Sequence, residues 1–139
     1  MRILVLCTAN SCRSQMAHGY LQHFAGDRAE IFSAGLRTDG VNPRAIAVMK
    51  EDGIDISQHT SNMAEEYRDI PFDHVITVCD MARETCPVFP GPAVQHHHDF
   101  PDPAGVKGTE AEIMAAFRDV RKEIKVYCRD FVERHVLVL

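Results

Sequence analysis

The chain of 139 residues contains no apolar run long enough to cross a membrane. Its N-terminal apolar run has only about five residues, whereas a secretory signal peptide needs roughly 7–15, so we expect a cytoplasmic protein. The formal net charge is −5, whereas nucleic-acid-binding proteins usually carry an excess of positive charge. We therefore expect no membrane and no nucleic-acid partner, and an anionic ligand would need a local binding site.

The sequence also lacks internal repeats, low-complexity tracts and linkers. Its composition, 45% apolar and 25% charged, is that of an ordinary globular protein. Residues 1–139 are therefore predicted to form one domain, which is long enough to bury a core.

The cysteines do not form a familiar framework. Their number is odd, which fits poorly with the paired disulfides of a secreted protein, and the spacings of a zinc site are absent. In a reducing compartment we expect them to be catalytic, metal-binding or buried. The five are Cys7, Cys12, Cys79, Cys86 and Cys128.

Strand and helix patterns alternate along the chain. Short apolar runs predict strands over 2–6, 29–35, 72–80 and 93–100, and helical periodicity appears at 13–24, 42–53, 61–69 and 109–135. This alternation predicts an α/β fold with a doubly wound, four-stranded parallel sheet flanked by helices. Cys128 falls on the apolar face of the last helix, where we expect it to be buried.

Two cysteines follow predicted strands directly. Cys7 comes directly after the first strand, and Cys79 lies at the carboxyl end of the third. Ligands of doubly wound sheets bind beyond the carboxyl ends of the strands, so we expect these two cysteines to share a site.

The segment "CTANSCRS", residues 7–14, links a predicted strand to a predicted helix. Backbone N–H groups at a helix N-terminus bind anions, and the guanidinium of Arg13 can grip two oxygens of an oxyanion. This positive environment is expected to lower the pKa of Cys7, which then attacks the bound anion, and Ser14 could donate to the thiolate. The predicted oxyanion-binding residues are Thr8, Ala9, Asn10, Ser11, Cys12, Arg13 and Ser14.

Other interpretations of this loop fit less well. A nucleotide-binding loop requires glycines and a Lys-Ser/Thr pair that are absent here. An inert, buried Cys7 would leave Arg13 and Ser14 unexplained.

"CTANSCRS" resembles the phosphate-binding loop of the low-molecular-weight tyrosine phosphatase fold. The whole chain is similar to the thioredoxin-coupled arsenate reductases built on that fold. The similarity runs through "NSCRSQMA", "SAG", "VNPRAIAVMKEDGIDISQHTS", "VITVCD", "CP" and "DPAG". It implies an arsenate or phosphate oxyanion as substrate and thioredoxin as a transient partner.

Cys86 lies seven residues after Cys79. In a helix this separation gives about 10 Å of rise, too far for a disulfide, so bridging requires the segment to unwind. That behaviour fits a relay better than a structural crosslink. The resemblance implies that Cys7 attacks arsenate, Cys79 then attacks Cys7, and Cys86 attacks Cys79. Two buried, inert cysteines are the alternative.

Asp102 lies in the turn-forming stretch "FPDPAG". The resemblance implies that it is the general acid that protonates the leaving oxygen, although it could simply cap the turn. Tyrosine phosphatases of this fold usually carry aromatic residues after the matching "DP". Ala104 and Gly105 stand there instead, which favours a small inorganic substrate.

No cofactor and no metal site are expected. Some relatives bind potassium beside the loop, but His18 and Asn62 replace carboxylates here, so we expect at most a weak monovalent-cation site near Asn10 and Ser33. The run His96–His98 invites a metal assignment, yet strand alternation would place its members on different faces. Ala9 replaces a usual glycine, which matters if a positive φ is needed there.

The favoured hypothesis is an arsenate reductase that uses Cys7, Cys79 and Cys86, with Arg13 and Asp102 in its oxyanion site. The alternative is a low-molecular-weight phosphatase, which needs only Cys7, Arg13 and Asp102. A non-catalytic redox-sensing or phosphoanion-binding module is the third hypothesis. The sequence leaves open whether thioredoxin or a small thiol is the reductant.

Overall fold

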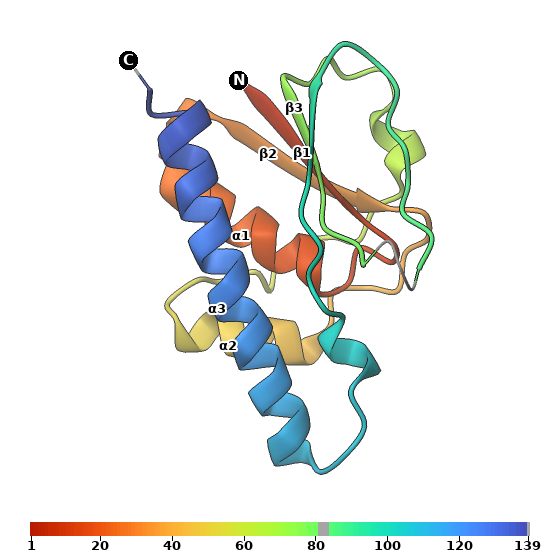
Figure 1. The fold of residues 1–139 in the computed structure, drawn as a ribbon, viewed down its shortest axis with the longest axis vertical. Helices are drawn as coiled ribbons and strands as arrows, with labels where there is room; N and C mark the ends of the chain where they lie inside the picture. Colours follow the sequence, from red (N-terminus) through yellow and green to blue (C-terminus); the bar gives the residue numbers. More distant parts are fainter. Residues whose placement is uncertain (81–83, 139) are drawn as a thin grey trace.

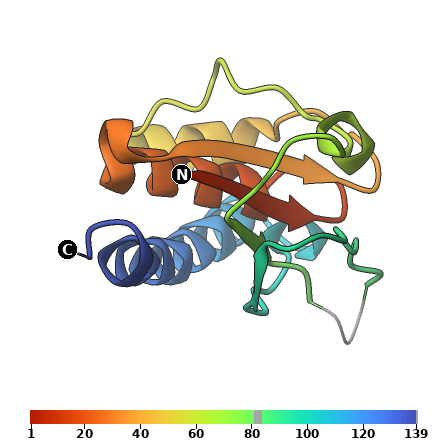
Figure 2. The ribbon, with the colours of Figure 1, turned by 90° about the horizontal axis from the view of Figure 1, so that it is seen from above.

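The computed structural model describes residues 1–80 and 84–138 (Figure 1). Four parallel strands form one sheet in the order β2-β1-β3-β4, and they are β1 (Arg2–Cys7), β2 (Glu30–Gly35), β3 (His74–Thr77) and β4 (Val94–His97). The predicted four-stranded parallel sheet with flanking helices is confirmed. Because the strands are parallel, their carboxyl ends meet at one edge, as the arrowheads of β1 and β2 show in Figure 2.

Three α-helices flank the sheet within the described residues, and capping residues predict where the second and the third begin. The helices are α1 (Arg13–Ala25), α2 (Pro43–Glu51) and α3 (Glu110–His135). The side chain of Asn42 accepts a hydrogen bond from the Arg44 N–H before α2. Thr109 and Glu112 form a reciprocal capping box before α3. The predicted helix over 61–69 is a short 3₁₀-helix, Ala64–Tyr67, and two further 3₁₀ turns occupy Gly26–Arg28 and Pro103–Gly105.

The two faces of the sheet are covered differently. Ile3 and Val5 point into the larger core, which they share with apolar side chains of α1, α2 and α3, including the buried Cys128. Leu4 and Leu6 point to the opposite face, into a smaller core covered by the Ala64–Tyr67 turn and by loops. Because side chains alternate along β1, the strand lies between two apolar layers. The side chain of Cys7 is on the same face as those of Ile3 and Val5.

Within residues 1–80 and 84–138, every helix is too short or too polar to cross a membrane. The start of β1 and the end of α3 lie at the opposite end of the sheet from the carboxyl ends of the strands (Figure 1).

Candidate active site

The oxyanion loop, residues 7–14, joins the end of β1 to the start of α1. Cys7 is the last residue of β1 and Arg13 is the first of α1, so the strand and the helix fix both ends of the loop. Cys7, Cys12, Arg13 and Asp102 line a pocket of about 180 Å³. The structure thus brings the predicted nucleophile, guanidinium and acid to one cavity.

Buried and partly buried hydrogen bonds hold the middle of this loop. The Asn10 carbonyl accepts hydrogen bonds from Gln15 Nε2 at 3.0 Å and from the Ser61 hydroxyl at 2.9 Å. Its side-chain amide donates to Ser14 Oγ at 2.8 Å. Asn10 has a φ of 49°, and among the described residues it is the only non-glycine residue with a positive φ. The expected difficulty at Ala9 therefore does not arise, because the left-handed conformation falls on its neighbour.

Gly35, at the end of β2, lies against the same loop. A Cβ atom at this position would be 2.7 Å from the Thr8 carbonyl oxygen and 2.8 Å from the Asn10 nitrogen. Only a glycine lets the two backbones approach this closely. The "SAG" segment is thus part of the framework of the site.

Arg13 is buried, and its charge is paired. Nη1 and Nη2 donate to the two carboxylate oxygens of Glu84, each at 2.7 Å. Nη1 also donates to the Phe100 carbonyl at 3.2 Å, and Nη2 lies 3.8 Å from a carboxylate oxygen of Asp102. Sequence reasoning missed Glu84, and its place between the two predicted relay cysteines is the signal that could have found it.

The expected low pKa of Cys7 is wrong for this form of the protein. Burial raises the pKa of the Cys7 thiol above its ordinary value and outweighs the opposing effects of Arg13 and the Thr8 N–H. The negative charges of Glu84 and Asp102 raise it further. The sequence showed the cation, but not the burial or the carboxylate that pairs with it.

Cys12 and Cys128 are free, buried thiols. Burial raises the pKa of Cys12 to about 12, against a weak hydrogen-bonding contact with Ser11. Cys128 lies in the core, and burial raises its pKa as well. Cys128 is therefore buried as predicted, and neither thiol takes part in a disulfide.

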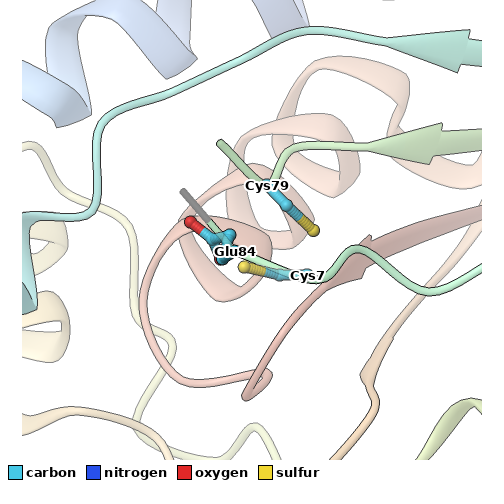
Figure 3. A group of neighbouring side chains, drawn as sticks. All are labelled: Cys7, Cys79 and Glu84. Atoms are coloured by element: carbon cyan, nitrogen blue, oxygen red, sulfur yellow. The ribbon is translucent and has the colours of Figure 1, made fainter. Parts of the chain in front are cut away.

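Cys79 and Cys86 are joined by a disulfide, with their Cα atoms 5.7 Å apart. Cys79 is fully buried one residue beyond Val78, and Cys86 is half-buried. The segment between them is not helical where it is described, as bridging requires, and residues 81–83 lie outside the described residues. The Cys7 sulfur, the Cys79 sulfur and a Glu84 carboxylate oxygen all lie within 4.8 Å of one another (Figure 3).

These three ligand atoms could in principle hold a metal ion, but their chemistry here does not suit one. The Cys79 sulfur is in a disulfide, and the Glu84 carboxylate is already paired with a guanidinium. A cation would be placed beside the positive charge of Arg13.

Asp102 caps a turn, which is one of the two roles considered for it. Its side chain accepts a hydrogen bond from the Ala104 N–H at 3.0 Å and so caps the 3₁₀ turn. It is also half-exposed at the mouth of the Cys7 pocket, close to Arg13. The turn therefore holds a carboxyl group at the pocket that contains Cys7 and Arg13, and its role as general acid stays a prediction.

The remaining predicted features lie outside the catalytic cluster. His96 contacts His74, Phe131 and His135, whereas its neighbour His97 contacts other side chains, as strand alternation predicts.

Beside the loop, the Asn10 side-chain oxygen accepts from the Asn62 N–H at 2.7 Å. Ser33 is hydrogen-bonded to His18, whose pKa burial lowers to about 3. The weak cation site stays a prediction.

Comparison with known proteins places the chain in a family. The family model described as low molecular weight phosphotyrosine protein phosphatase matches residues 2–136. The chain belongs to this family. Within it, the chain is 46% identical to "Arsenate reductase 1" of Staphylococcus epidermidis over 95% of its own length and 96% of the relative's. It is 44% identical to an arsenate reductase of Halalkalibacterium halodurans, over 94% of each chain.

Solved structures of arsenate reductases align with nearly the whole chain. The chain aligns with an arsenate reductase in its oxidised state with a TM-score of 0.81 and 29% identity, over 96% of this chain and 97% of the other. It aligns with a thioredoxin-dependent arsenate reductase of Corynebacterium glutamicum with a TM-score of 0.69 and 25% identity, over 96% of this chain and 60% of that one. The chain thus groups with the arsenate reductases of the family.

Proposed function

We propose that this protein reduces arsenate to arsenite through a relay of Cys7, Cys79 and Cys86. The observation that carries the proposal is the disulfide beside the nucleophile. Cys79 is bonded to Cys86, and its sulfur lies within 4.8 Å of the Cys7 sulfur. A hydrolytic phosphatase needs the oxyanion loop and an acid, but it has no use for a disulfide at this place.

The relay consists of three sulfur displacements. The Cys7 thiolate attacks arsenic(V) held by Arg13 and the loop N–H groups, and water leaves after Asp102 protonates the departing oxygen. The Cys79 thiolate then attacks the Cys7 sulfur. A sulfur–sulfur bond forms, the sulfur–arsenic bond breaks, and its electron pair stays on arsenic, which departs as arsenite. Two electrons have thus moved from two thiols to arsenic.

The third displacement moves the disulfide away from the nucleophile. The Cys86 thiolate attacks Cys79 and releases Cys7 as a thiolate. The structure has the arrangement expected after this step, with Cys7 free and Cys79 bonded to Cys86.

Thioredoxin is the proposed reductant of this disulfide, in the cytoplasm. Cys86 is half-buried and Cys79 is fully buried, so an external thiol reaches Cys86 first. Attack at Cys86 forms a mixed disulfide and releases Cys79 as the leaving thiolate. A structural relative that depends on thioredoxin supports this assignment.

The walls of the site favour a small anion. Ala104 and Gly105 line the Cys7 pocket, and within the described chain no aromatic side chain lines either this pocket or the adjoining cleft that contains Glu84. A phosphotyrosyl ring would therefore find no flat apolar wall to stack on.

The test is an arsenate-dependent assay coupled to thioredoxin, thioredoxin reductase and NADPH. The wild type should oxidise NADPH, and Cys79→Ser and Cys86→Ser should show no turnover above background. Cys128→Ala is the matched control, because this cysteine is buried away from the site, and it should retain full activity.

Two outcomes would contradict the proposal. Normal arsenate turnover by Cys79→Ser would show that the reaction does not use the proposed cysteine relay. Turnover of the wild type with glutathione but not with thioredoxin would replace the proposed partner with a small-thiol system.

A further inference from the structure

The carboxylate of Glu84 binds Arg13 as a substrate oxyanion would. Both of its oxygens accept from the guanidinium at 2.7 Å, which is the bidentate geometry that arginine uses for oxyanions. One of them also accepts from the Thr8 hydroxyl at 2.5 Å, and the other from the Asp80 N–H at 3.1 Å. Two of these partners, Thr8 and Arg13, belong to the oxyanion loop. The side chains of Arg13 and Glu84 are only 4% and 17% exposed, so water competes little for the pair.

The position of Glu84 is tied to the disulfide. Glu84 lies between Cys79 and Cys86, which are separated by seven residues. While the disulfide is closed, their Cα atoms are 5.7 Å apart, and Glu84, two residues before Cys86, is held in a small ring. Figure 3 shows its side chain beside Cys7 and Cys79. Opening the disulfide removes this restraint and gives the segment far more conformations.

The guanidinium of Arg13 cannot form a bidentate pair with Glu84 and with a substrate oxyanion through the same Nη1 and Nη2 groups at the same time. In the disulfide form its Nη1 and Nη2 groups are bound to Glu84, and the buried Nε has no hydrogen-bond partner among the described residues. An oxyanion entering the pocket would have to take Arg13 from Glu84 or share the cation with it. It would also approach a second negative charge in a site of low dielectric constant, which is unfavourable.

We propose that Glu84 is a positioning residue that makes oxyanion binding depend on the redox state of Cys79 and Cys86. In the disulfide form it holds Arg13 and weakens oxyanion binding, and in the dithiol form it leaves and Arg13 turns to the substrate. This proposal deepens the proposed function and rests on it. If Cys7 attacked a second arsenate while Cys79 was still oxidised, no thiol could complete the reaction, so excluding the anion at this stage avoids a stalled adduct.

The test measures binding of inorganic phosphate, which needs no turnover. Isothermal titration calorimetry is run on the disulfide form and on the dithiol form of the wild type, with the redox state checked by thiol counting. The dithiol form should bind phosphate at least about tenfold more tightly, because one charged bidentate contact is worth on the order of a tenfold change in affinity. Equal affinities of the two forms would overturn the proposal without any variant.

Glu84→Gln then assigns the effect to the carboxylate. The disulfide form of this variant should bind phosphate nearly as tightly as its dithiol form. Glu110→Gln is the matched control, because Glu110 makes a similar two-oxygen pair with Arg44 on the surface, and it should keep the wild-type ratio. If Glu84→Gln also keeps that ratio, Glu84 is only a structural partner of Arg13.

The two proposals fail in different ways. If the protein does not reduce arsenate, no arsenite appears in the coupled assay, whatever the phosphate affinities are. If Glu84 has no such role, arsenite is formed and the two redox forms bind phosphate alike.

Discussion

The oxyanion loop and the described residues of the redox segment, 79–80 and 84–86, are held in different ways, although Cys79 and Glu84 lie beside Cys7. The loop is fixed by the close approach of Gly35 and by hydrogen bonds from Gln15 and Ser61, none of which depends on redox chemistry. The redox segment is tied to the site by the Cys79–Cys86 disulfide and by the pairing of Glu84 with Arg13. The proposed catalytic cycle breaks the disulfide and, in our account, also releases Glu84 from Arg13. In this account, the loop keeps one arrangement to bind the substrate, whereas the redox segment is attached by a disulfide that opens during electron transfer.

The largest expected effect comes from the residue that both regions need. Cys7→Ser should abolish arsenate reduction and any hydrolysis of an aryl phosphate, because a hydroxyl at this position is a far weaker nucleophile than a thiolate. Both activities are measured on the same preparation. An intact reductase activity in Cys7→Ser would show that the chemistry occurs elsewhere in the chain.

The contributions of the two regions to activity can be told apart by a variant that lacks only a relay cysteine. Cys79→Ser should lose arsenate turnover but keep residual aryl-phosphate hydrolysis within about twofold of the reduced wild type, because Cys7, Arg13 and Asp102 are untouched. The two rates are measured under reducing conditions. Parallel loss of both activities would mean that Cys79 supports the loop and not only the relay.

A substitution at the end of β2 should disturb the oxyanion loop. Gly35→Ala would place a Cβ atom 2.7 Å from the Thr8 carbonyl oxygen, and the backbone must shift to accept it. We expect a loss of about 1–3 kcal/mol in the free energy of unfolding, measured in urea. Gly105→Ala is the control for stability, since a Cβ atom there meets nothing within 4 Å. Equal stabilities of the two variants would contradict the close approach.

The last expected effect, comparable in size to that of Gly35→Ala, concerns the attachment of the redox segment. Burial disfavours the charged form of Glu84, but hydrogen bonds from Arg13 and Thr8 prevail and lower its pKa from 4.5 to about 2. Because folding lowers this pKa, the carboxylate stabilises the folded protein above about pH 4.5, and the contribution is lost as the pH falls toward 2.

Glu84→Gln in the disulfide form should therefore be less stable than the wild type at pH 7 by about 1–3 kcal/mol. The difference should shrink between pH 4.5 and about pH 2. Urea unfolding at several pH values measures it, and a difference independent of pH would contradict the ion pair.

Local patterns in the sequence predicted most of the fold. The caps at Asn42 and Thr109, the strand alternation and the burial of Cys128 all depend on neighbours in the chain, and these predictions are confirmed. The sharing of a site by Cys7 and Cys79 was also predictable, since parallel strands end at the same edge.

Three features of the molecule were not predictable in this way. The raised pKa of Cys7 depends on its burial, and the pairing of Glu84 with Arg13 depends on the ring that the disulfide closes. The unequal cover of the two sheet faces depends on how α1, α2 and α3 pack together. Each of these results from tertiary packing and not from a sequence motif.

The most direct test of the relay is a single turnover of Cys86→Ser without thioredoxin. The fully reduced variant is mixed with excess arsenate, and arsenite is quantified while peptide mapping locates any disulfide. The account predicts one arsenite per protein molecule and a trapped disulfide between Cys7 and Cys79. No arsenite, or a disulfide between Cys7 and Cys12 instead, would contradict it.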